Sequence, residues 1–164
     1  MFERGQLGRK TGGGFYRVTK TEDGGRLKET FDLDAGDWRA AREPELLPAH
    51  HELATLMSAH DPCGAFARDL MGGTLLYAAD LVPQIADDIV NVDRAMRWGF
   101  AWQKGPFEML DALGPSALAS DMKARGQDLP AMLAVLDQAG ATSFYRNDGT
   151  EYLGRDGAWH KVTG

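Results

Sequence analysis

The first residues of a type that could do chemistry form a glycine-rich stretch, Gly8–Gly14 (GRKTGGG). A phosphate-binding loop has a glycine immediately before its lysine and a second glycine five residues earlier. Here Arg9 stands before Lys10, and no Gly-x-Gly-x-x-Gly sequence lies between an expected strand and an expected helix, as dinucleotide binding requires. The stretch therefore predicts a tight turn, and we expect the chain to bind no nucleotide cofactor.

A second group consists of metal-ligand types, with three histidines and the only cysteine in a segment broken by prolines: His50, His51, His60 and Cys63. Their spacing matches none of the compact patterns of tetrahedral zinc sites. We therefore expect solvated histidines, a half-buried thiol and no metal site.

A third group is acidic. Asp87 and Asp88 point about 100° apart on a helix, and Asp93 lies near an expected helix start, where negative charge is favourable. Helix capping and a solvated face explain these carboxylates better than a catalytic cluster does. No set of serine or cysteine with histidine and aspartate has the context of a nucleophile, so we expect no catalytic residue in this chain.

The remaining candidate is the aromatic stretch 97–110, RWGFAWQKGPFEML. It predicts a corner between two helices, with one helix ending at Gly99 and the next beginning at Pro106. Its aromatic residues suit a core, but they also suit a surface offered to another domain or to an acyl chain. The candidate interface residues are Trp98, Phe100, Trp102, Lys104 and Phe107.

The elements that position this corner are mainly helical. Apolar residues recur at helical spacing from Ala65 onward, which predicts a central helix that is apolar over most of its circumference. Its apolar face follows Phe66, Leu70, Thr74, Tyr77 and Leu81 and is widened by Leu75, Leu76 and Val82. Gly72-Gly73 within it predicts a close neighbour, because two glycines otherwise weaken a helix. Pro83 should interrupt the helix, and Asn91 or Asp93 could cap its successor.

Three further helices are expected after Gly105, because each has its own start or stop signal. They cover 106–113, 115–125 and about 129–139, closed by Gly114, Gly126 and Gly140. A short helix is expected near 50–57. Asp-Gly turns near 23–25, 148–149 and 156–157 predict a hairpin at 18–38 and a terminal meander. The fold class is therefore mainly α with small β pieces at its edges.

The net charge, the length of the apolar runs and the cysteine count argue against several classes of function. A net charge of −6 and the lack of a basic run argue against nucleic acid and anionic membranes as partners. No apolar run is long enough for a transmembrane helix. A single cysteine allows no internal disulfide, which favours a reducing, cytoplasmic compartment.

The sequence from Leu75 to Gly114 resembles the C-terminal helical domain of bacterial 3-hydroxyacyl-CoA dehydrogenases. The family's D-x-A-M-x-x-G-F-x-W and G-P-F-E-x-x-D-x-x-G motifs match Asp93, Ala95, Met96, Gly99, Phe100, Trp102, Gly105, Pro106, Phe107, Glu108, Asp111 and Gly114. LGRKTGGGFYR near the N-terminus is similar to the segment that ends a first copy of this domain. Residues 142–145 are similar to the segment that ends a second copy.

The resemblance implies a fold like the C-terminal domain of 6-phosphogluconate dehydrogenase. It also implies a large parent enzyme of fatty-acid β-oxidation that oxidises the 3-hydroxyl group of an acyl-CoA and reduces NAD. The family's nucleotide-binding and catalytic motifs are not in this sequence, so the chain alone is expected to be inactive. Its partners would be the nucleotide-binding domain and the first helical domain of the parent, with acyl-CoA as the parent's substrate.

On this interpretation residues 1–17 are the tail of a preceding helical copy, 18–64 are a linker with a short hairpin and a helix, and 65–164 are a second helical copy with a terminal meander. Two alternatives remain open. The chain could be an autonomous helical docking or dimerisation module, for which a homodimer is one form. It could also bind acyl-CoA by itself.

Overall fold

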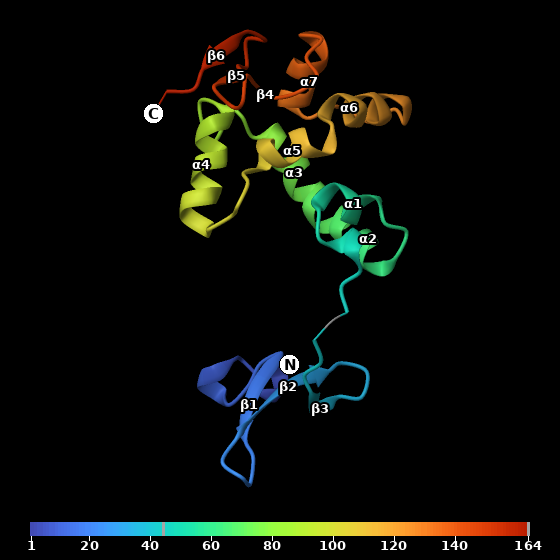
Figure 1. Ribbon diagram of the computed structural model, residues 1–164, viewed down its shortest axis with the longest axis vertical. Coiled ribbons are helices and arrows are strands. Elements are labelled where there is room, and N and C mark those ends of the chain that lie inside the picture. The colour runs from blue at the N-terminus through green and yellow to red at the C-terminus, as the bar shows by residue number, and fades with distance from the viewer. Residues whose placement is uncertain (44, 164) are drawn as a thin grey trace. The chain divides into compact units, whose positions relative to one another are not determined.

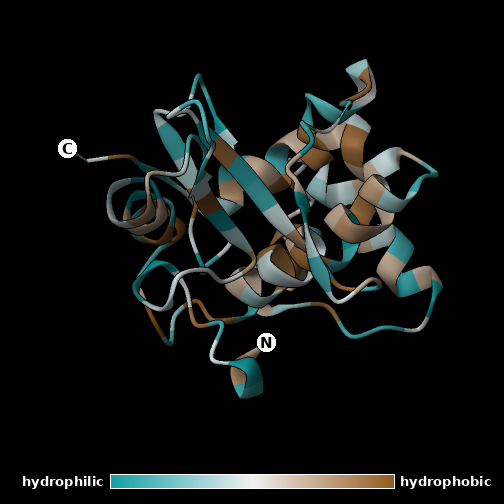
Figure 2. Cartoon of the chain, turned by 90° about the horizontal axis from the view of Figure 1, so that it is seen from below, coloured by the Kyte–Doolittle hydropathy of each residue, from teal (hydrophilic) through white to brown (hydrophobic). Residues whose placement is uncertain are grey.

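The computed structural model describes residues 1–43 and 45–163, and the chain divides into two compact units, Met1–Glu45 and Leu46–Gly164. The first unit is built around a small antiparallel sheet, and the second is mostly helical (Figure 1). Hydrophobic residues, brown in Figure 2, are concentrated on the helices. The predicted fold class, mainly α with small β pieces, is confirmed.

The first unit is a three-stranded sheet with the strand order β1-β2-β3. Its strands are β1 (Tyr16–Lys20), β2 (Arg26–Asp32) and β3 (Asp37–Ala40). β1 and β2 form the predicted hairpin, and the backbone N–H of Thr21 donates to the carbonyl of Gly25 across its turn. Arg17 of β1 pairs with Glu29 of β2 at 2.7 Å and lies over the ring of Trp38 on β3.

The glycine-rich stretch forms the predicted tight turn. A 3-10 helix, Arg9–Thr11 (η2), is closed by a bridge between Gly8 and Gly13. Gly12 has φ of 89°, a left-handed conformation that side chains other than glycine rarely adopt. Another 3-10 helix, Phe2–Arg4 (η1), precedes it.

The second unit begins with a 3-10 helix and two short helices: η3 (Pro48–His50), α1 (Leu53–Ser58) and α2 (Pro62–Ala67). α2 continues through a π-helical turn, η4 (Arg68–Gly72), into α3 (Gly73–Asp80). The following helices are α4 (Ile89–Phe100), α5 (Pro106–Leu113), α6 (Pro115–Ala124) and α7 (Ala131–Gln138). The predicted meander closes the chain as β4 (Tyr145–Arg146), β5 (Glu151–Leu153) and β6 (Trp159–Lys161).

The core of the second unit lies where α3, α4, α5, α6, α7 and the meander meet. In Figure 1, α3 and α5 occupy the middle of this unit, with the meander at one end and α1 and α2 at the other. Its fully buried large side chains include Leu75, Ile89, Phe107, Leu110, Leu133, Leu136, Phe144 and Leu153. The core thus joins segments that are distant in sequence, and it holds the aromatic corner between α4 and α5 in place.

The prediction of a central helix from Ala65 onward is confirmed for only part of its apolar face. Leu75 and Val82 are buried as expected, whereas the residues that define the middle of the predicted face are not. Phe66 and Tyr77 are each 66% exposed, and Leu70 is 53% exposed. The buried residues are Leu75 and Ala79, on the opposite side, because α3 packs against α5 and α7. Periodicity locates the apolar stripes of a helix, but here both sides are apolar, and the side with smaller residues allows the closer packing.

Gly72 and Gly73 lack the close neighbour that the sequence predicted. A Cβ at Gly73 would meet no atom within 4 Å, and one at Gly72 would meet only the end of the Met57 side chain, at 3.7 Å. The two glycines instead mark the point where the π-helical turn passes into α3.

Two predicted helix boundaries of α4 are also wrong. The helix is capped by Asp88, whose Oδ1 accepts from the N–H of Asn91 at 2.8 Å, and neither Asn91 nor Asp93 is the cap. At the other end α4 continues past Gly99, and it is Ala101, with φ of 57°, that adopts the left-handed conformation that ends it. The predicted ends of α5, α6 and α7 at glycines are confirmed.

No helix among the described residues is both long and apolar enough to span a bilayer. The division into a tail, a linker and a second helical copy stays a prediction, as does the likeness to the C-terminal domain of 6-phosphogluconate dehydrogenase.

Candidate functional site

The aromatic corner is a short connection between two helices. α4 ends at Phe100, and the backbone N–H of Trp102 still donates to the carbonyl of Met96 at 3.4 Å. The chain then extends to Gly105, which precedes α5 with φ of −77° and ψ of 171°. Pro106 suits the first helical position, because its fixed φ is helical and this position needs no N–H donor.

A carboxylate inside α4 caps the start of α5. Asp93 Oδ1 accepts from the backbone N–H of Phe107 at 2.8 Å, and Oδ2 accepts from the N–H of Glu108 at 3.2 Å. The hydroxyl of Tyr145 donates to the same Oδ2 at 2.8 Å. One side chain therefore joins α4, the first turn of α5 and β4. The cap depends on Gly105, since a Cβ there would collide with Asp93.

Burial dominates the ionisation of this carboxyl group. Asp93 is only 3% exposed, and burial raises its pKa to about 7, although the hydrogen bonds from Phe107 and Tyr145 act in the opposite direction. Burial and the nearby Asp93 also raise the pKa of the Tyr145 hydroxyl. The prediction that Asp93 is a cap of its own helix or a solvated residue is therefore wrong. Its position in sequence could not reveal a partner 14 residues away.

Glu108 strengthens the same corner. Its Oε2 accepts from the N–H of Gly105 at 2.7 Å, and its Oε1 accepts from Arg97 Nη1 at 3.1 Å. The first contact is the backward half of a capping box. The second connects the last turn of α4 to the first turn of α5, so the angle between these helices is fixed from both sides.

The other aspartate of the second motif fixes the meander. Asp111 accepts from the backbone N–H groups of Phe144 and Tyr145, at 2.6 and 2.8 Å. Burial raises its pKa. Phe144 is thereby placed against Phe107, with ring centroids 5.0 Å apart and planes at 81°. These motif residues thus have packing and capping functions.

The five candidate interface residues fall into three environments. Phe107 is fully buried in the core, so the prediction of a core corner holds for this residue. Trp98 and Phe100 are 77% and 70% exposed on the last turns of α4. Trp102 is half-buried and Lys104 is exposed. The corner is therefore core on one side and an uncovered aromatic surface on the other.

Trp102 and Lys104 line a hollow between the corner and α1. It has a volume of about 660 Å³, and its lining residues are His51, Glu52, Leu53, Ala54, Trp102, Gln103, Lys104, Met109 and Ala112. The hollow combines an indole and a methionine with one ammonium group, on Lys104, and one carboxylate, on Glu52. These groups suit a ligand or partner with both an apolar and a charged part.

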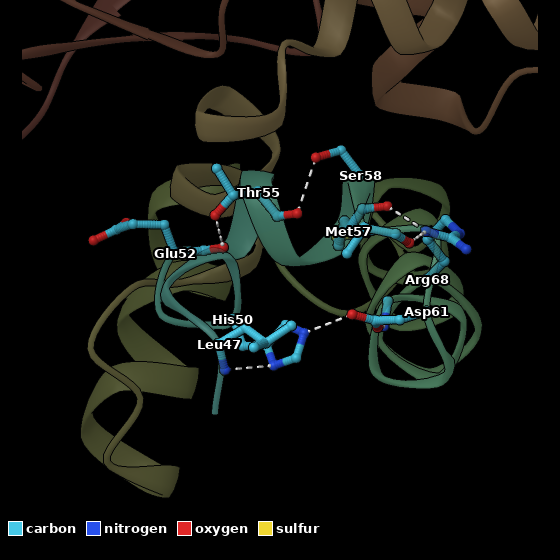
Figure 3. A network of polar contacts seen from close by, with 10 residues as sticks. Leu47, His50, Glu52, Thr55, Met57, Ser58, Asp61 and Arg68 are labelled. Carbon is cyan, nitrogen blue, oxygen red and sulfur yellow. Dashed lines mark hydrogen bonds and ion pairs between the residues drawn. The ribbon is translucent and has the colours of Figure 1, made fainter. Parts of the chain in front are cut away.

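A second place of chemical interest lies at the start of α2 (Figure 3). His50 Nε2 is 2.7 Å from Asp61 Oδ2, and Cys63 lies beside both. The backbone N–H of Leu47 donates a hydrogen bond to His50 Nδ1 at 3.2 Å, so Nδ1 is an acceptor and the ring proton is on Nε2. The Nε2–H group then donates a hydrogen bond to Asp61. The N–H of Gly64 and the His50 ring lower the pKa of Asp61.

This cluster differs from the set of residues considered in the sequence. His50 and Cys63 are part of it, whereas His51 and His60 are not. Asp61 was missed, and its only sequence signal is the Asp-Pro step, which is typical of a helix N-cap. The helix that this cap begins brings Cys63 close to a histidine 13 positions earlier in the chain.

Comparison with known proteins relates the chain to enzymes of fatty-acid oxidation. A Bacillus subtilis protein named as a 3-hydroxyacyl-CoA dehydrogenase is 33% identical over 99% of this chain. Proteins of Rickettsia felis and Rickettsia prowazekii, named as trifunctional enzymes of a fatty acid oxidation complex, are 30% and 29% identical over 67% of the chain. The chain spans 21% of the Bacillus protein and 15% of each Rickettsia protein. No protein-family profile and no solved structure matches the chain.

Proposed function

From the chain's relation in sequence to part of the 3-hydroxyacyl-CoA dehydrogenase family, we propose that it is a non-catalytic helical domain of an NAD-dependent enzyme of this kind. In the parent it packs against the nucleotide-binding domain and the first helical domain. It also helps to shape the cleft for acyl-CoA. The parent binds NAD, and this chain contributes no cofactor ligand. The cytoplasmic location remains a prediction.

The observation that carries this proposal is the match to the Bacillus dehydrogenase over nearly the whole chain. The motif residues in the second unit support it, because Asp93, Glu108 and Asp111 have their polar atoms engaged in holding elements together. A domain that serves as a scaffold needs such contacts. It needs no nucleophile, base or nucleotide loop of its own.

The exposed aromatic residues support the packing role. Trp98 and Phe100 lie on a helix whose core side is already complete, so their exposure is not compensated within the unit. Aromatic side chains are enriched where protein surfaces meet. In the proposed parent, this surface is covered by another domain.

The hollow beside Trp102 and Lys104 supports a role near the acyl-CoA. An acyl-CoA has an apolar chain and anionic phosphates, and the hollow pairs an indole with an ammonium group. Lys104 is exposed and is therefore free to reach a phosphate.

The direct test is a chimaera in which this chain replaces the aligned region of the Bacillus subtilis relative. Formation of NADH from a 3-hydroxyacyl-CoA and NAD is measured for the chimaera, for the parent, and for the parent with the region deleted. We expect the chimaera to keep most of the activity and the deletion to lose it. The isolated chain should form no NADH under the same conditions.

A double variant of the chimaera separates packing from folding. Trp98→Ser with Phe100→Ser should lower activity about tenfold or more, as expected when aromatic anchors of an interface are removed. The thermal unfolding of the isolated chain should hardly change, because both side chains are exposed. A folded chimaera no more active than the deletion, or NADH formation by the isolated chain, would contradict the proposal.

An autonomous dimerisation module is the second candidate, and the uncovered stripe of Phe66, Leu70 and Tyr77 favours it. Sedimentation of the isolated chain tests it. A dimer that Phe66→Ser and Tyr77→Ser together dissociate, combined with an inactive chimaera, would favour the module over the dehydrogenase domain.

A further inference from the structure

We propose that His50, Asp61 and Cys63 form a binding site for one divalent cation of the thiophilic class that Zn²⁺ represents. The ligand atoms of these residues, an imidazole nitrogen, a carboxylate oxygen and the thiol sulfur, all lie within 4.8 Å of one another. Zinc sites are built from these three ligand types. In a tetrahedral zinc site neighbouring ligand atoms are roughly 3.3–3.8 Å apart, as bond lengths of about 2.0–2.3 Å require. Small side-chain movements therefore suffice to admit an ion. The proposal is independent of the proposed function.

The local backbone already holds the ligands close to these positions. Asp61 caps α2 with one oxygen, since Oδ1 accepts from the N–H of Gly64 at 2.8 Å, and this leaves Oδ2 directed at His50. Gly64 lies so close to the carbonyl of Ala59 that a Cβ would collide with it. Arg68 Nη1 donates to the carbonyls of Met57 and Ala59, each at 2.7 Å, and closes the turn between α1 and α2 (Figure 3). The site is thus largely preformed.

The charges and protons balance on binding. Asp61 contributes the negative charge of its carboxylate through Oδ2, the oxygen that is not used to cap α2. The ion takes the lone pair of His50 Nε2, so the ring proton moves from Nε2 to Nδ1, and the hydrogen bond from Leu47 N–H is exchanged for one to water. That bond is exposed, which makes the exchange inexpensive. Cys63 binds as a thiolate and gives up its proton. Binding therefore releases about one proton per ion.

There is room beside the cluster for a fourth ligand. His50 and Cys63 both line a cavity of about 420 Å³ whose other walls are largely apolar, including Leu46, Leu56, Phe66 and Leu70. A water molecule could complete the coordination from this side. Three protein ligands and one open position are the arrangement found in accessible zinc sites.

The ligand set decides the class of cation. A thiolate and an imidazole are poor ligands for Mg²⁺ and Ca²⁺, which take oxygen atoms, and good ligands for Zn²⁺ and Co²⁺. An ion held here would join η3 to the start of α2 across the segment from His50 to Cys63. It would therefore stabilise the entry into the helical unit, as any ligand of the folded state does.

The experiment uses Co²⁺ as a spectroscopic substitute for Zn²⁺ on the reduced full chain. Because Cys63 is the only cysteine, a thiolate-to-cobalt charge-transfer band in the near ultraviolet reports this residue alone. We expect this band, visible bands of a four-coordinate ion, saturation at one ion per chain, and displacement by Zn²⁺. Calorimetry in buffers of different ionisation enthalpy should give about one proton released.

Three variants identify the ligands. Cys63→Ser should abolish the band, and it should leave the circular dichroism unchanged because the thiol is exposed. His50→Gln should weaken binding by about 100-fold or more, since changes to outer-shell groups alone cost about 10- to 100-fold. Asp61→Asn keeps a good N-cap but removes the charge, so it should weaken binding without unfolding α2. His51→Gln and His60→Gln are matched controls and should bind cobalt as the unchanged chain does.

Several outcomes would overturn the proposal. These are the absence of a charge-transfer band at millimolar Co²⁺, equal loss of binding in His60→Gln and His50→Gln, and a stoichiometry above one that Cys63→Ser does not reduce. A thermal stabilisation by Mg²⁺ equal to that by Zn²⁺ would indicate an oxygen-only site and would also refute thiolate ligation.

Discussion

Asp93 in α4 accepts a hydrogen bond from the backbone N–H of Phe107, 2.8 Å away at the start of α5. The carboxylate of one helix thereby performs the capping function that the glycine before the next helix cannot perform. The first motif supplies the acceptor and the second supplies the donors, so the two motifs act as one structural unit.

The buried carboxyl group makes stability depend on pH. Above about pH 4 the unfolded chain has released the Asp93 proton, whereas the folded chain keeps it until about pH 7. The folded state binds more protons in this window, so the contribution of Asp93 falls as pH rises, by up to about 1.4 kcal/mol per pH unit. The contribution is fully present below pH 4 and is lost as pH rises through 7.

The measurement is the free energy of unfolding of the unchanged chain minus that of Asp93→Asn, from pH 4 to pH 8. Groups with lowered pKa values, such as Asp61 and Asp156, cancel in this difference. Asp88→Asn is the control, because asparagine is an equally good cap. A difference that stays constant across this range would show that Asp93 is ionised throughout.

One glycine from each of the two motifs should respond in opposite ways to substitution by alanine. Gly105→Ala should destabilise the chain by about 2–3 kcal/mol or more, because the new Cβ collides with Asp93 and overpacking has few routes of relief. Gly99→Ala should stabilise α4 by about 0.5–1 kcal/mol, since a Cβ there meets nothing within 4 Å and alanine is the better helix former. Urea unfolding followed by circular dichroism compares them, and equal effects would refute the close contact.

Substitution of the phenylalanines on the two sides of the corner should show, by the loss of stability, which side belongs to the core. Phe107→Ala should cost about 3–5 kcal/mol, the usual loss for a fully buried aromatic side chain. Phe100→Ala should change stability by no more than about 0.5 kcal/mol. Trp102→Ala should lie between them, because its indole is half-buried. A loss for Phe100→Ala as large as for Phe107→Ala would mean that the outer face is covered.

The hydroxyl of Tyr145 should contribute through its bond to Asp93. Tyr145→Phe should lower the free energy of unfolding by about 1 kcal/mol, the typical net value of one hydrogen bond. It should also raise the pKa of Asp93 further, because the lost hydrogen bond favours the ionised form. Tyr152→Phe, which removes a hydroxyl from the neighbouring strand, serves as the control. An NMR titration of the Asp93 carboxyl carbon checks the shift.

Local signals in the sequence predict most of the elements. Pro106, Pro115 and the glycines at 114, 126 and 140 mark helix ends that depend on the backbone of a few adjacent residues, and these predictions are confirmed. Gly99 fails as a stop because glycine permits a left-handed conformation without requiring it. Ala101 adopts that conformation, since the chain must turn there to reach Gly105.

Long-range relationships are what the sequence does not reveal. Nothing near Asp93 indicates that its partners are Phe107 and Tyr145, because their proximity results from how the helices pack. The exposure of Phe66 has the same origin, since which side of a helix is covered depends on its neighbours. Asp61 was overlooked because its proximity to His50 arises from a turn between two helices.

The contact between Gly105 and Asp93 limits which function can be assigned to a protein because it shares these two motifs. The absence of a Cβ at Gly105 and the buried carboxylate of Asp93 set the distance between α4 and α5. The most recognisable motif residues of this chain are therefore the ones that this geometry requires. A protein that shares these motifs is expected to share the connection between the two helices. Evidence that it transfers hydride has to come from other residues.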